Sequence, residues 1–76
     1  MADVNEIRAL KASFLGAMDA AAALGGMRQR VLAIDSNADI LEADLEEIGR
    51  LTLAHAVAAQ ALRGLVESMR TRRAGT

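Results

Sequence analysis

Apolar residues recur at alternating steps of three and four along the second half of the chain. With two polar residues among them, these positions are Ala38, Leu41, Leu45, Ile48, Thr52, His55, Ala59, Leu62, Val66 and Met69. Alternation of threes and fours over several heptads is the spacing of a coiled-coil seam. The pattern therefore predicts a helix over about residues 38–72, followed by a frayed tail at 73–76.

The first half carries a similar stripe. Its members are Val4, Ile7, Leu10, Phe14, Ala17, Ala21, Leu24, Met27, Val31 and Ile34. Their spacing predicts a helix over about residues 3–34, although two consecutive steps of three occur just before and at Met27. Gly25 and Gly26 also lie inside this range, and each glycine costs about 1 kcal/mol in a helix interior. Because the stripe continues across the pair, it favours one unbroken helix over a break into three helices.

A turn is predicted at residues 35–37. Ser36 followed by Asp39 has the form of a capping box, and a new apolar stripe opens directly after it. If the two helices pair antiparallel with residue numbers that sum to about 72, their stripes match from end to end. Arg28 and Arg30 then lie near Asp44 and Glu42. The predicted fold is all-α, one domain over residues 1–76 that forms a long helical hairpin.

The second helix carries apolar residues on more faces than one hairpin covers, because Leu51, Ala54, Ala58, Ala61 and Leu65 form another heptad-spaced line. A helix that is apolar most of the way round must be covered. We therefore expect a homodimer that forms a coiled-coil-like four-helix bundle with close alanine packing; a partner helix from another protein is the alternative. The predicted oligomer seam consists of Leu51, Ala54, His55, Ala58, Ala61, Leu62 and Leu65. In this seam His55 is a polar residue of the kind that sets register.

The composition limits the chemistry. There are 17 alanines, one phenylalanine and no cysteine, and nine basic residues oppose ten acidic ones. Thiol chemistry and aromatic stacking of nucleotide bases are excluded by these counts. No hydroxyl lies at a spacing from His55 that suggests activation, so neither an enzyme nor a cofactor is expected. Nor is a metal: Asp35, Asn37, Asp39 and Glu46 are spaced like a calcium loop, but β-branched Ile40 stands where that loop needs glycine.

Six acidic residues and no basic one fall within residues 35–47. The structural interpretation is that acids favour a helix start through the helix dipole. The functional interpretation is an acidic tip, formed by Asp39, Glu42, Glu46 and Glu47, that docks on a basic protein surface, with Leu53 and Val57 as a second contact. The leading hypothesis is thus a non-enzymatic protein-binding module, acting as an adaptor, regulator or inhibitor.

Two other roles remain open. Arg63, Arg70, Arg72 and Arg73 give a basic helix end that could contact nucleic-acid phosphates, and the extra apolar face could make the chain a structural subunit of a larger assembly. The longest apolar stretches are shorter than the roughly 18–20 residues of a membrane span. A cytoplasmic protein without membrane contact is expected.

Overall fold

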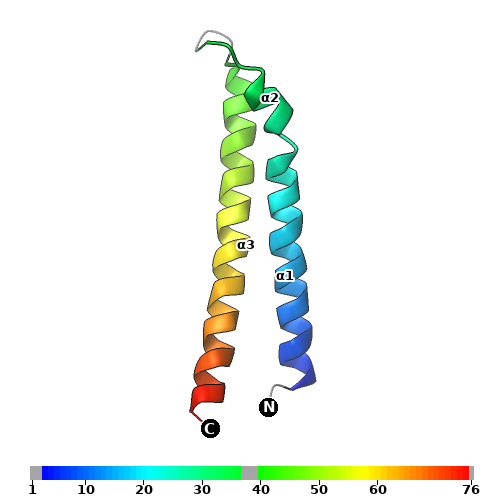
Figure 1. The fold of residues 1–76 in the computed structure, drawn as a ribbon, viewed down its shortest axis with the longest axis vertical. Helices are drawn as coiled ribbons and strands as arrows, with labels where there is room; N and C mark the ends of the chain where they lie inside the picture. The colour runs from blue at the N-terminus through cyan, green and yellow to red at the C-terminus, as the bar shows by residue number, and fades with distance from the viewer. Residues whose placement is uncertain (1–2, 37–39, 76) are drawn as a thin grey trace.

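The computed structural model describes residues 3–36 and 40–75, and it contains three helices within them: α1 (Val4–Gly25), α2 (Arg28–Leu32) and α3 (Glu42–Ala74). Helices α1 and α3 lie side by side and antiparallel, with α2 at the loop end and both termini at the opposite end (Figure 1). The Cα atoms extend over 57 × 18 × 16 Å. The predicted all-helical hairpin is confirmed for these residues.

Helix α1 begins at a side-chain cap. The Oδ1 atom of Asp3 accepts a hydrogen bond of 2.8 Å from the backbone N–H of Glu6, which satisfies one of the free donors of the first turn. Glu6 itself places negative charge near the positive end of the helix dipole. The helix therefore starts where the sequence predicts.

The predicted long first helix is interrupted after Gly25, so the structure differs there from the sequence prediction. The backbone N–H of Met27 donates to the carbonyl of Leu24, and that of Gly26 reaches the carbonyl of Ala23 as well as that of Ala22. Bonds to the third residue back are those of a tightened, 3₁₀-like turn with three residues per turn.

The helix predicted from residue 38 begins later, at Glu42. Leu41 is its N-cap residue, with extended backbone angles and no side-chain capping bond. Acidic Glu42 and Asp44 occupy the first turn, where they complement the helix dipole. Of the predicted capping box, Ser36 lies before the helix and Asp39 lies outside the described residues.

Near the loop end, the side of α3 that faces α1 is rotated from the predicted seam. Leu41 and Leu45 are 62% and 50% exposed, and Thr52 is exposed as well, whereas Leu51 is only 7% exposed. Farther along α3 the covered side includes the predicted seam and a neighbouring line. The covered positions of α3 are Asp44, Glu47, Ile48, Leu51, His55, Ala58, Ala59, Leu62, Leu65, Val66 and Met69. On α1 and just after it, the covered positions are Glu6, Leu10, Ser13, Ala17, Ala20, Leu24 and Met27.

Ion pairs close both ends of the hairpin. Arg30 pairs with Asp44 at the loop end, where a sum of 72 would have placed Arg28 opposite Asp44, and Glu6 pairs with Arg72 near the termini. The Arg72 side chain also reaches back along its helix, because its Nε lies 3.5 Å from the carbonyl oxygen of Ser68. The paired residue numbers sum to 74 at the loop end and to 78 near the termini, rather than to the predicted 72.

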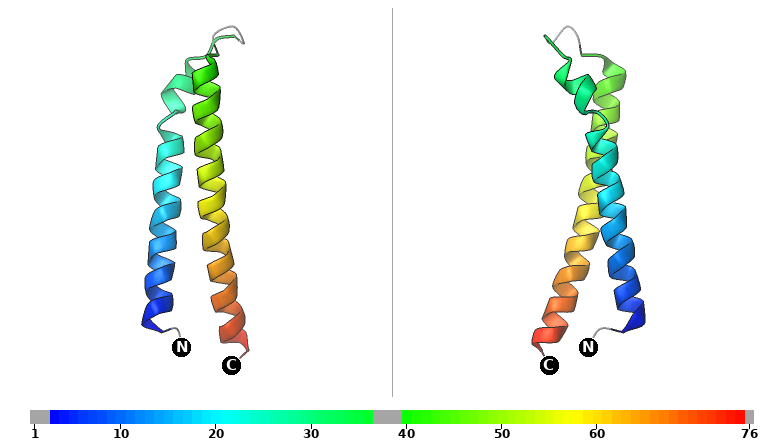
Figure 2. Two further views of the ribbon diagram at one scale, coloured as in Figure 1. Left: turned by 180° about the vertical axis from the view of Figure 1, so that it is seen from behind. Right: turned by 45° about the vertical axis from the view of Figure 1, so that its right-hand side comes forward.

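The two long helices diverge toward the termini, which Figure 2 shows most clearly in its right-hand view. Among the described residues only Met27 and Leu51, at 5% and 7% exposure, are buried hydrophobic residues. No helix in the described part of the chain is long and apolar enough to cross a membrane.

Candidate partner-binding face on the third helix

Four of the six residues predicted to bind a partner lie along one side of α3. Glu42, Glu46, Leu53 and Val57 are all exposed, and their steps of four, seven and four keep them on the same side of an α-helix. The covered stripe through Leu51 faces α1, so this side points away from α1. We call these four residues the outer face.

Of the other two acids of the tip, Glu47 is engaged within the chain and Asp39 is not described; the neighbouring Asp44 is engaged as well. Asp44 is paired with Arg30, and Glu47 accepts a hydrogen bond of 3.0 Å from Nε of Arg50. That hydrogen bond holds the pKa of Glu47 below its ordinary value against the opposing effect of desolvation, and the positive charges of Arg50 and Arg30 add to the lowering. Asp39 lies outside the described residues.

Glu42 and Glu46 have a different environment. Both are exposed, and neither forms an ion pair with any residue that the structure describes. Intramolecular pairing therefore leaves two carboxylates available on the outer face. Of the four acids of the predicted tip, Glu47 is thus engaged and Glu42 and Glu46 are not paired with any described residue.

A shallow hollow adjoins the apolar end of the outer face. It has a volume of about 580 Å³ and is lined by Ala56, Val57, Gln60 and Ala61. The small alanine side chains leave room beside Val57, so an apolar side chain of a partner can sit against it. Leu53 lies one turn before Val57 and is 65% exposed.

The predicted oligomer seam divides between covered and exposed residues in a single chain. Leu51 is buried, and His55, Ala58, Leu62 and Leu65 are half-buried. Ala54 and Ala61 are exposed. The single hairpin therefore already covers most of the line that seemed, from sequence, to require a second copy.

The basic end of α3 is partly engaged. Arg72 pairs with Glu6, and Arg70 lies 3.7 Å from Glu67 on the same helix. Arg63 and Arg73 are exposed. A shallow hollow near the end of the helix is lined by Glu67, Arg70, Thr71, Arg73 and Ala74, so a carboxylate lies among its arginines.

Within the described residues, no group of three or more His, Cys, Asp or Glu side chains is arranged to hold a metal ion. His55 is half-buried, and its ring forms no hydrogen bond with any residue that is described. Comparison of the chain with protein-family models, curated proteins and solved structures gives no significant match. The arguments on function therefore rest on the residues themselves.

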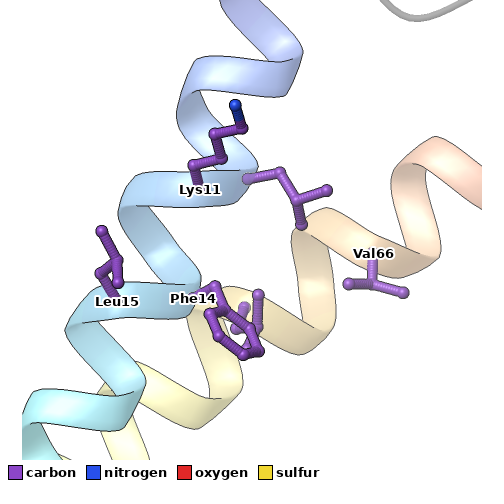
Figure 3. Close-up of a pocket in the computed structure, with 6 residues that line it drawn as sticks. Lys11, Phe14, Leu15 and Val66 are labelled. Atoms are coloured by element: carbon purple, nitrogen blue, oxygen red, sulfur yellow. The ribbon is translucent and has the colours of Figure 1, made fainter.

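One surface was not predicted as a site. An open cleft of about 660 Å³ is lined by Leu10, Lys11, Phe14, Leu15, Leu62 and Val66, in the half of the hairpin nearer the termini. Phe14 is directed from α1 toward α3 there, with Val66 on the facing helix (Figure 3). The signal in the sequence is a second heptad stripe on α1, formed by Val4, Ile7, Phe14 and Met18. The predicted stripe included Val4, Ile7 and Phe14 but not Met18.

Proposed function

We propose that this protein is a non-enzymatic protein–protein interaction module that acts as a homodimer and docks on another protein through the outer face of α3. The partner surface is basic opposite Glu42 and Glu46 and apolar opposite Leu53 and Val57. In the cell such a module serves as an adaptor, regulator or inhibitor of the protein that it holds.

The observation that carries the proposal is the alignment of the outer face. Two carboxylates without an ion pair and two large apolar side chains share one exposed side of a single helix. Helix recognition by another protein commonly uses a row of anchors on one helical side, and flanking charges steer the encounter. If the outer face served only to contact water, polar residues would suffice in place of Leu53 and Val57.

The small number of buried hydrophobic residues in the single hairpin supports the dimer. Two buried hydrophobic residues among those described are few for a chain of 76 residues, since small domains depend on a well-covered core. Pairing two hairpins into a four-helix bundle covers the remaining apolar sides.

Affinity capture from the native host tests the outer face. We expect a protein that is held by the wild-type chain to be lost with Glu46→Lys and with Leu53→Asp. Asp19→Lys is the matched control, because Asp19 is also an exposed helical acid, on α1 rather than on α3. Capture that all three variants retain equally would contradict the proposal.

Nucleic-acid binding by the basic end of α3 is the second candidate function. Glu6 and Glu67 hold two of its four arginines, so fewer positive charges are available for phosphates. Fluorescence anisotropy with labelled DNA and RNA at low salt separates the two roles, since the interaction module gives no change. A structural role in a larger assembly would instead give particles above a dimer in light scattering.

A further inference from the structure

We propose that the second copy packs antiparallel across one particular side of the hairpin, which we call the cleft face: Ile7, Phe14 and Met18 of α1 with Leu45, Leu62 and Val66 of α3. This inference rests on the proposed homodimer and names its surface and orientation. The outer face stays free in such a dimer.

The cleft lies within this face, in the half nearer the termini. Phe14, the largest side chain of the chain, is 51% exposed although it lies over an apolar cleft beside Leu62 and Val66 (Figure 3). Burial of a phenylalanine is worth about 1.5–3 kcal/mol relative to its exposure, so half of that stabilisation is unused in the single chain. An apolar side chain from another helix fits between Phe14 and Val66.

Helix α1 carries a complete second seam. Val4, Ile7, Lys11, Phe14, Met18 and Ala21 follow steps of three and four without a slip, next to the stripe that faces α3. Val4, Ile7, Phe14 and Met18 are all among the exposed large hydrophobic residues. Two adjacent heptad seams on one helix are the arrangement of a helix that contacts two neighbours in a bundle. The hairpin provides only one of them.

Helix α3 contributes to the same face. Val66 lines the cleft, and steps of seven back from it reach Ala59, Thr52 and Leu45. Residues seven apart lie nearly on one side of a helix, with a drift of about 20° per step. Leu45, which is 50% exposed, therefore extends the cleft face to the loop end.

The surface area fits a dimer. The chain exposes 5987 Å², whereas a compact monomer of 8.0 kDa exposes about 4,450 Å² by the usual scaling. The elongated hairpin therefore exposes about 1,500 Å² more surface than a compact chain of its mass, and a second copy packed along it can cover part of that surface.

The charge distribution sets the orientation and identifies the occupant as a second copy. Residues 19–57, the loop half of the hairpin, contain seven acids and three arginines, a net charge of −4. The remaining residues, in the half with the termini, contain three acids and six bases, a net charge of +3. An antiparallel pair places each acidic half beside the basic half of its partner, whereas a parallel pair opposes like charges.

Cysteine mapping tests the orientation, because the natural chain has no cysteine. Ile7→Cys and Leu45→Cys lie at opposite ends of the cleft face. The two purified variants are mixed and then oxidised. We expect the predominant product to be a disulfide that joins one chain carrying Ile7→Cys to one chain carrying Leu45→Cys. Predominance of the two symmetric disulfides would show a parallel dimer and overturn the proposal.

The surface is tested by sedimentation and light scattering of the purified chain over a range of concentrations. The wild type is expected at twice 8.0 kDa. Phe14→Asp should raise the concentration of half-dissociation at least about 100-fold, because a buried carboxylate would be unpaired. Leu53→Asp, on the outer face, should leave the concentration of half-dissociation unchanged. A monomeric wild type, or equal effects of the two variants, would overturn the proposal.

Phe14→Asp could dissociate the dimer or prevent folding, so a second test uses thermal melts of the wild type. If the cleft face is a dimer interface, the melting temperature rises with protein concentration, and a concentration-independent melt would contradict it. These measurements use the purified chain alone, so their outcome is separate from that of the affinity capture. Partner capture by the outer face can fail while the dimer persists, and the reverse also holds.

Discussion

The carboxylate of Glu6 pairs with the guanidinium of Arg72, which follows it by 66 residues. Glu6 lies in the first turn of α1 and Arg72 in the last turn of α3. At the other end of the hairpin, Arg30 in the last turn of α2 pairs with Asp44 in the first turn of α3. Antiparallel helices bring a positive dipole end beside a negative one, so each of these charges stabilises its own helix end and its neighbour across the hairpin.

A charge exchange separates these two effects. Glu6→Gln and Arg72→Gln should each lower the free energy of unfolding by about 0.5–1 kcal/mol. The exchanged variant, Glu6→Arg with Arg72→Glu, restores the pair but puts each charge at the wrong end of its helix, so we expect only partial recovery. Urea denaturation at one protein concentration measures all four proteins. Full recovery by the exchange would show that the helix dipoles contribute nothing.

The adjacent glycines should respond differently to alanine. A Cβ atom at Gly25 meets no atom within 4 Å, whereas one at Gly26 would lie 3.2 Å from the carbonyl oxygen of Ala23. Gly25→Ala should therefore raise the free energy of unfolding by about 0.5–1 kcal/mol through its higher helix propensity. Gly26→Ala should raise the free energy of unfolding by less, because its Cβ atom would lie close to the carbonyl oxygen of Ala23. Equal stabilities in chemical denaturation would show that the tightened turn does not constrain Gly26.

Leu51 and Leu53 form a matched pair on α3. Leu51→Ala should lower the free energy of unfolding by about 2–3 kcal/mol, because the side chain is buried and leaves a cavity. Leu53→Ala should change it by less than about 0.5 kcal/mol, since Leu53 is exposed. Circular dichroism during denaturation compares the two variants with the wild type. Equal losses would contradict the observed rotation of α3.

Removal of Arg50 should raise the pKa of Glu47. The hydrogen bond from Arg50 lowers that pKa in the folded chain, so the pair stabilises the fold above the unfolded pKa of glutamate, about 4.3. This contribution is lost as the pH falls through the lower folded value. In Arg50→Gln the carboxyl resonance of Glu47 should titrate at higher pH by NMR. An unchanged midpoint would show that the pair does not persist in solution.

Several features followed from the sequence alone. Helix-forming composition and three–four spacing indicated two long helices paired antiparallel, which the structure confirms for the described residues. That pairing placed Arg28 and Arg30 near Asp44 and Glu42, and the observed ion pair joins Arg30 to Asp44. These features depend on local propensity and on the position of one turn, so they need no knowledge of packing. The exposed acids Glu42 and Glu46 were also singled out from sequence as binding candidates, and that role stays a prediction.

The side of each helix that faces its neighbour was decided only by the tertiary structure. Ala-rich helices carry heptad patterns on adjacent sides, and alanine fits equally well inside or outside, so spacing alone does not choose between them. Asp44 and Glu6 lie on the sides of the helices that face each other, where the sequence pattern predicts apolar residues. Their partial burial is favourable only because an arginine of another helix pairs with each of them. The sequence thus determined that the chain folds as a helical hairpin. Packing and ion pairing determined its rotation, and with it the separation of an outer face from a cleft face.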